Sequence, residues 1–75
     1  MSDLIQSFGS AVRHFRESAG WSQEFLAEKA DLNRSYLGEV ERGRVVPSLA
    51  TAGKLAAALG LSLSSLLSHC ERESV

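Results

Sequence analysis

The sequence predicts an all-α domain built as a compact bundle of five helices. Eleven leucines and nine alanines stand against five valines and one isoleucine. Leucine and alanine favour helices, whereas β-branched residues favour strands. Apolar residues recur at intervals of three and four along most of the chain, which is the spacing of one helix face. Glycine, serine and short polar segments interrupt this pattern, and the single proline, Pro47, falls in one of the interruptions.

Capping residues predict where these helices begin and end. Serine and asparagine side chains accept hydrogen bonds from the free amides of a first helical turn, and glycine is common just after a last turn. By these signals the five helices begin at about Ser2 or Asp3, Ser22, Asn33, Ser48, and Ser62 or Ser64. The first, third and fourth stop at Gly20, Gly43 and Gly60.

A tight turn joins the second and third of these helices. Only residues 31–33 separate them, and so short a connection holds the third helix at a steep angle to the second. The close crossing requires a small residue, which Ala27 supplies, while Leu37 and Val40 define the buried face of the third helix. The outward face of that helix then consists of Arg34, Ser35, Gly38 and Glu39.

Two sequence motifs surround this turn. Residues 20–30 read GWSQEFLAEKA, and residues 33–37 and 40–43 read NRSYL and VERG. The first motif resembles the signature of phage-repressor-like (Cro/C1, or XRE) transcriptional regulators, and the others resemble that family's recognition helix and its I-E-R-G ending. The resemblance covers about residues 8–67. It implies a lambda-repressor-like DNA-binding domain over residues 1–75, with the helix-turn-helix unit at about 22–42.

Three details refine this resemblance. The Arg34-Ser35-Tyr36 start of the third helix, in so short a chain, is similar to controller proteins of restriction–modification systems. Asp31 stands where the family usually has glycine, and aspartate tolerates the left-handed backbone conformation better than most residues. Phe25 stands where the family is often polar, so it is either partly exposed or part of an enlarged core.

The third helix is the expected reader of double-stranded DNA. A recognition helix enters the major groove with its first residues toward the base edges. Arg34 is the leading base reader because its guanidinium can bond O6 and N7 of guanine; the alternatives are a phosphate contact or a solvated side chain. Ser35 contacts a base or a phosphate or is a plain helix residue, and Tyr36 either reaches the DNA or packs on the first helix. Glu39 accepts from cytosine N4, orients Arg34, or disfavours wrong sequences.

Phosphate contacts are expected at two helix ends. The second helix begins at Gln23, where free amides and the positive end of the helix dipole favour an anion, and the resemblance implies a phosphate contact for this glutamine. Ser22 joins it in this interpretation, and Asn33 is first a cap and second a backbone contact. Arg42 and Arg44 follow the recognition helix, where they bind phosphates or remain surface charges.

The resemblance also pairs Arg16 of the first helix with Glu41 of the third, as a structural ion pair. A chain this short has a marginal core, and its last helix is rich in leucine, so we expect helices over about residues 48–70 to dimerise. The expected dimer contacts are Leu61, Leu63, Leu66, Leu67 and Cys70. Such a homodimer would read a near-palindromic operator.

Composition and motifs also limit the function. The net charge of −1 argues against a protein that coats nucleic acid by bulk charge. His69 and Cys70 are neighbours whose side chains leave a helix in different directions, so they do not form a base–nucleophile pair, and His14 stands alone. No phosphate loop, metal-ligand spacing, cofactor motif, small-molecule site, signal peptide or membrane span is indicated. We therefore expect a cytoplasmic protein of bacterial or phage origin that is not an enzyme.

The leading interpretation is a homodimeric transcription regulator that controls its own operon, with RNA polymerase as a further candidate partner. One alternative is a protein-binding module, such as the antitoxin of a toxin–antitoxin pair. A second alternative is a purely structural helical domain. Binding to DNA at physiological salt separates the first interpretation from the other two.

Overall fold

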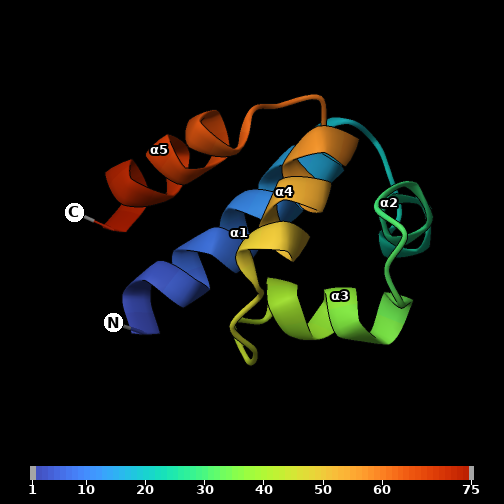
Figure 1. The fold of residues 1–75 in the computed structure, drawn as a ribbon, viewed down its shortest axis with the longest axis horizontal. Coiled ribbons are helices and arrows are strands. Elements are labelled where there is room, and N and C mark those ends of the chain that lie inside the picture. The colour runs from blue at the N-terminus through green and yellow to red at the C-terminus, as the bar shows by residue number, and fades with distance from the viewer. Residues whose placement is uncertain (1, 75) are drawn as a thin grey trace.

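The computed structural model describes the backbone of residues 2–74 and the side chains of residues 4–70. Within these limits it contains five α-helices and no strand. The helices are α1 (Ser2–Ser18), α2 (Gln23–Lys29), α3 (Arg34–Glu41), α4 (Leu49–Ala58) and α5 (Leu63–Ser74). α2 and α3 lie at one end of the molecule, and α5 packs along α1 (Figure 1). The predicted all-α, five-helix fold is confirmed.

Side-chain caps begin four of the helices where the sequence predicts them, and at α5 Ser62 Oγ accepts from the amide of Ser65 at 3.1 Å. Ser22 Oγ accepts a hydrogen bond from the amide of Phe25 at 3.0 Å, which caps α2. Asn33 Oδ1 accepts from the amides of the second and third residues of α3. Ser48 Oγ accepts from the amide of Thr51 at 3.1 Å, which caps α4. These bonds satisfy amides that have no partner inside the helix, so they determine where each helix starts.

The turn between α2 and α3 depends on a left-handed residue. Asp31 has a φ of 57°, the conformation that glycine adopts most easily and that aspartate tolerates. The amide of Leu32 donates to the carbonyl oxygen of Ala27 at 2.8 Å, which closes the turn. Ala27 is only 3% exposed, so a small residue does occupy the close crossing of the two helices.

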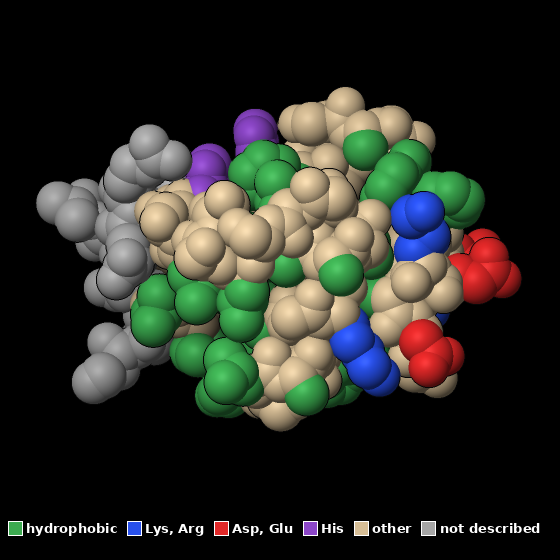
Figure 2. All heavy atoms as spheres, turned by 45° about the horizontal axis from the view of Figure 1, so that its top comes forward, with side chains coloured by type: hydrophobic (Ala, Val, Ile, Leu, Met, Phe, Trp, Pro, Cys, Tyr) green, Lys and Arg blue, Asp and Glu red, His purple; other side chains and the backbone are tan. Residues whose placement is uncertain are grey.

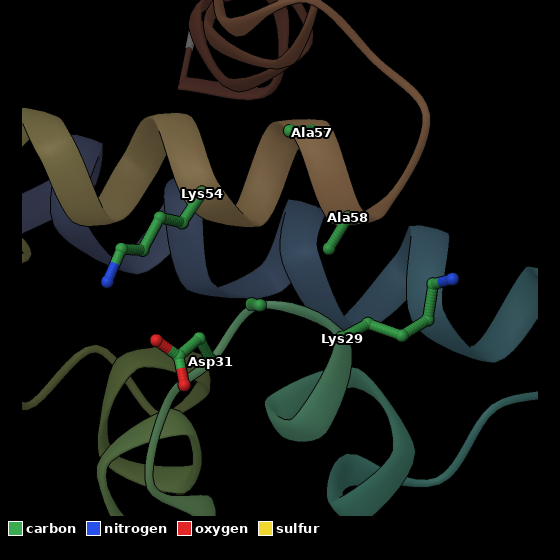
Figure 3. Close-up of a pocket in the computed structure, with 6 residues that line it drawn as sticks. Lys29, Asp31, Lys54, Ala57 and Ala58 are labelled. Atoms are coloured by element: carbon green, nitrogen blue, oxygen red, sulfur yellow. The ribbon is translucent and has the colours of Figure 1, made fainter.

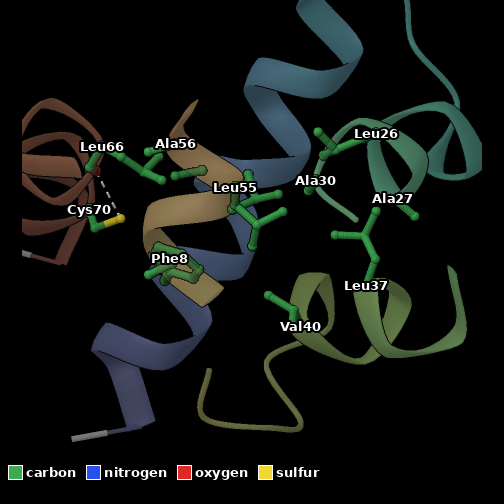
Figure 4. Packing of buried hydrophobic residues seen from close by; sticks show 13 residues of the cluster. Phe8, Leu26, Ala27, Ala30, Leu37, Val40, Leu55, Ala56, Leu66 and Cys70 are labelled. Carbon is green, nitrogen blue, oxygen red and sulfur yellow. Dashed lines mark hydrogen bonds between the residues drawn. The ribbon is translucent and has the colours of Figure 1, made fainter. Parts of the chain in front are cut away.

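Buried leucine, valine and alanine side chains hold α3 against the rest of the molecule. Leu26 of α2, Leu37 of α3 and Leu55 of α4 are fully buried and point into one shared core (Figure 4). α1 and α3 also touch through their backbones at Gly9. A Cβ atom on Gly9 would lie 2.3 Å from the carbonyl oxygen of Val40. The outward face of α3 is therefore fixed in orientation by contacts on its inward face.

The expected dimer contacts on α5 require a correction. Leu66 and Cys70 are 0% exposed, because they lie one helical turn apart on the face of α5 that packs into the chain's own core. Cys70 Sγ donates to the carbonyl oxygen of Leu66 at 3.1 Å (Figure 4). Neither side chain can contact a second molecule in this conformation. Leu61, Leu63 and Leu67 are partly buried and retain some exposed surface.

No single helix of the described chain is both long and apolar enough to cross a membrane. α4 and α5 together reach that length and composition, but they are bent by 100° at their junction. The apolar side chains Ala52, Leu55 and Ala56 of α4 are buried in the core, which accounts for the apolar character of this helix.

Candidate nucleic-acid interface

Glu41, at the end of α3, is the centre of a buried polar network. Its carboxylate accepts hydrogen bonds from Nε and Nη2 of Arg16 at 2.8 and 3.0 Å, and from Nε2 of Gln23 at 2.9 Å. Arg16 Nη1 donates to the carbonyl oxygen of Trp21 at 2.8 Å. The hydrogen bond to Glu41 raises the pKa of Arg16, against burial, which lowers it. The network joins α1, the start of α2 and the end of α3 into one rigid unit.

The bond between Gln23 and Glu41 is a contact that the sequence analysis missed. The two residues lie 18 positions apart, so no local pattern in the sequence connects them. A carboxamide nitrogen carries two hydrogens, and only one of them is used by Glu41. Glu41 thereby holds the Gln23 side chain in place while the second N–H stays available to a ligand.

The outward face of α3 and the start of α2 enclose a shallow hollow of about 420 Å³. All four side chains predicted to read bases line it, and so do two of those predicted to bind phosphate. Its lining residues are Gln23, Arg34, Ser35, Tyr36, Gly38, Glu39 and Arg42. Tyr36 is half-buried and also packs against the core, so its two alternative roles are both compatible with its position.

The charged side chains of this hollow are not equally free to bind a ligand. Arg34 is exposed, and no acidic side chain within residues 4–70 pairs with it. Glu39 instead pairs with Arg42 one turn further along α3. In this structure Glu39 is therefore bonded to Arg42 and not to Arg34, the arginine that one interpretation of the sequence had it orient.

The remaining predicted phosphate contacts lie outside the hollow. Ser22 and Asn33 are exposed, and each uses its side-chain oxygen as a helix cap. Arg44 is exposed in the segment that follows α3. These three residues occupy the helix ends that border the hollow, at the start of α2 and at both ends of α3.

An aromatic cluster on the surface of α2 was not predicted. Phe25 is 44% exposed, and its ring meets that of Trp21 edge-on with 5.0 Å between centroids. Lys29 Nζ lies 5.2 Å from the centre of the Trp21 ring and 5.6 Å from that of Phe25. Phe25 is thus a surface residue and not an extension of the core. The four-residue spacing of these side chains was the available signal in the sequence.

A second hollow, of about 470 Å³, lies between the end of α2 and α4. It is bordered by Lys29, Asp31 and Lys54, but the two ammonium groups point away from each other (Figure 3). The lysines therefore do not converge on one ligand.

The histidine and cysteine side chains do not assemble a reactive site. The rings of His14 and His69 stack with 5.5 Å between centroids, and histidine side chains show at one edge of the molecular surface (Figure 2), whereas the Cys70 thiol is buried in the core. Within residues 4–70 no group of three or more His, Cys, Asp or Glu side chains could hold a metal ion.

A fixed outer helix joined to its predecessor by a four-residue connection, with a polar outward face, defines a helix-turn-helix module. The helix-turn-helix family HTH_3 matches residues 12–66, and the chain belongs to this Cro/C1-type family. Its members and the chain's relatives are DNA-binding transcription regulators, not enzymes.

Three relatives illustrate the match. The control protein C.MunI of a Mycoplasma species is 38% identical over 74 residues, which cover 97% of this chain and 100% of that protein. The immunity repressor of Bacillus phage phi105 is 42% identical over 59 residues, 79% of this chain, and the match spans only 41% of the repressor. The crystal structure of the restriction–modification controller protein C.AhdI from Aeromonas hydrophila matches with a TM-score of 0.81 and 44% identity, over 88% of this chain and 98% of that one.

Proposed function

We propose that the protein is a sequence-specific regulator that binds a near-palindromic operator in double-stranded DNA as a homodimer. The observation that carries the proposal is the outward face of α3, where Arg34 is exposed without an acidic partner while Leu37 and Val40 hold the helix by its other face. A guanidinium in this position suits O6 and N7 of a guanine in the major groove. Ser35 and Tyr36 border it in the same hollow.

The residues around the hollow supply the backbone contacts of this proposal. Gln23 donates its second amide hydrogen to a phosphate, and Arg44 adds an unpaired charge beyond the end of α3. Ser22 and Asn33 lie beside these groups. Each keeps its helix cap and adds a further contact to the DNA backbone. Such contacts position the protein on the duplex but carry no sequence information.

Binding selection from a random pool of double-stranded DNA near physiological salt tests the proposal. Wild type is expected to enrich a two-fold-symmetric motif, and Arg34→Ala is expected to lose about tenfold in preference at one position of each half-site. Arg13→Ala is the matched control, because Arg13 is an exposed arginine of α1 paired with Glu17, and it should keep the motif. Enrichment of no motif by any of the three proteins would favour a protein-binding module such as an antitoxin.

The homodimer part of the proposal rests on an apolar surface between the start of α1, the loop before α4 and the start of α4. Val46 and Leu49 are 74% and 76% exposed and Leu4 is 46% exposed. They border a hollow of about 180 Å³ whose lining also includes Leu67 of α5. Exposed apolar patches of this kind mark interaction surfaces. The two recognition helices of a dimer on B-DNA lie roughly 34 Å apart, and we propose that a second copy covers this surface.

Sedimentation velocity of Leu49→Lys tests the dimer. The charge would lie in the centre of the apolar surface, and the variant is expected to be monomeric at concentrations where wild type is dimeric. Ala57→Lys places the same charge on an exposed position at the other end of α4 and should leave the dimer intact. Wild-type protein that remains a monomer at micromolar concentration, with operator present, would refute this part of the proposal.

The relatives named control proteins suggest what is regulated. We propose that the chain controls a restriction–modification operon that includes its own gene, through its concentration and through contact with RNA polymerase. A reporter fused to the chain's own upstream DNA tests this proposal. A reporter whose output does not change when the protein is expressed would contradict it.

A further inference from the structure

Glu39 and Arg42 form one connected side-chain unit on the DNA-facing surface of α3. They are bonded through Oε2 of Glu39 and Nη2 of Arg42, and both line the hollow that Arg34, Ser35 and Tyr36 also line. Their side chains are 37% and 52% exposed, so both reach a ligand. The Arg42 side chain is therefore turned back along the recognition helix instead of extending beyond its end.

Gly38 makes room for this arrangement. A Cβ atom on Gly38 would lie 3.3 Å from both terminal nitrogens of Arg42, a contact that forces the guanidinium to shift by a few tenths of an ångström. Gly38 is itself buried although it lies on the outward face of α3, because the guanidinium covers it. A glycine in mid-helix is unfavourable, and here its lack of a side chain lets the Arg42 guanidinium lie close against the helix backbone.

The charge of the unit argues against a simple phosphate contact. Glu39 neutralises Arg42, and a carboxylate next to a phosphate is repelled, so this pairing weakens what Arg42 offers to the DNA backbone. In the major groove a G·C pair presents two acceptors on guanine, O6 and N7, and one donor on cytosine, N4–H. Arg42 carries donors beyond the one bonded to Glu39, and Glu39 carries a second oxygen with free lone pairs. The unit thus matches both bases of one pair.

We propose that Glu39 and Arg42 act together to read one G·C base pair in each half-site, Arg42 donating to guanine and Glu39 accepting from cytosine N4, with Gly38 as the positioning residue. This inference rests on the proposed DNA-binding function and deepens it. It assigns base reading to Arg42, which the sequence had placed at a phosphate.

Binding selection with Arg42→Ala, Glu39→Ala and the double variant tests the inference. Each single variant is expected to lose about tenfold in preference for G·C. Both should lose it at the same position of the half-site, and that position should differ from the one relaxed by Arg34→Ala. Because the two side chains work as a unit, the double variant should lose no more than either single variant. Gly38→Ala should weaken the same preference while raising thermal stability.

Arg44→Ala is the comparison for a phosphate contact. Its affinity should fall by a similar factor on all sequences, and the slope of log affinity against log salt should become shallower by about 0.9 for each protomer, or about 1.8 for the homodimer. The same uniform loss for Arg42→Ala, or an unchanged motif for Glu39→Ala, would overturn the coupled reader. A wild-type protein that enriches no motif overturns the proposed function together with this inference. A wild-type motif that Arg34→Ala still relaxes, but that stays unchanged in Arg42→Ala and Glu39→Ala, overturns this inference alone. Thermal melting of each variant confirms that it is folded.

Discussion

The buried network around Glu41 makes a quantitative prediction about stability. Glu41→Gln keeps the shape of the side chain but removes the charge that compensates Arg16, whose side chain is only 10% exposed, and Glu41 itself is 3% exposed. Removing one partner of a buried pair costs about 3–5 kcal/mol. A chain of 75 residues has a total unfolding free energy of about 4–11 kcal/mol. The substitution is thus expected to remove a large part of the stability, at the lower end of that cost because Arg16 keeps its bond to the Trp21 carbonyl.

Urea unfolding measures this loss directly. The midpoint should fall sharply while the dependence on denaturant stays the same, because the unfolded state is unchanged. Arg13→Ala is the control, since its ion pair with Glu17 is exposed on both sides and such pairs contribute about 0.2–1 kcal/mol. A loss of less than about 1 kcal/mol in Glu41→Gln would refute the reasoning. The cost of about 3–5 kcal/mol applies only to an ion pair that is shielded from solvent.

Substitutions at two further positions, Gly9 and Asp31, test the backbone contacts that orient α3. Gly9→Ala should destabilise the protein severely, because its Cβ would lie 2.3 Å from the Val40 carbonyl oxygen and the helices would have to separate; a melting temperature equal to that of wild type would contradict the close approach of α1 and α3. Asp31→Gly should stabilise the protein by about 1 kcal/mol in urea unfolding, because the residue has a φ of 57° and left-handed conformations cost non-glycine residues about that much. Asp31→Ala should instead destabilise it, and a gain of stability in Asp31→Ala would show that the turn is not left-handed in solution.

The secondary structure was predictable because its signals are local. The caps at Ser22, Asn33 and Ser48 are bonds across two or three residues, and their geometry does not depend on the rest of the fold. The left-handed turn at Asp31 was expected from the resemblance, because the family usually has glycine at this position and aspartate tolerates the conformation. The helix-turn-helix unit, and with it the family, could therefore be recognised before the structure was known.

The organisation of the candidate site was predictable only in part. The side chains on the outward face of α3 followed from its periodicity, since Leu37 and Val40 had to face inward. The partner of Glu39 did not follow, although Arg42 lies only three positions away. The sequence offered two arginines and no means to choose between them, and only the structure shows that Glu39 pairs with Arg42, whose guanidinium lies over Gly38.

The sequence alone determined the helices, their caps, the short turn and the identity of the helix that faces outward, because each depends on interactions within a few residues. Only the tertiary structure decided that Leu66 and Cys70 belong to the core, since the face of α5 that packs inward depends on how the helix meets α1. It also decided that Gln23 binds a carboxylate 18 residues away. Contacts of this range depend on how the helices pack, which no local pattern of residues encodes.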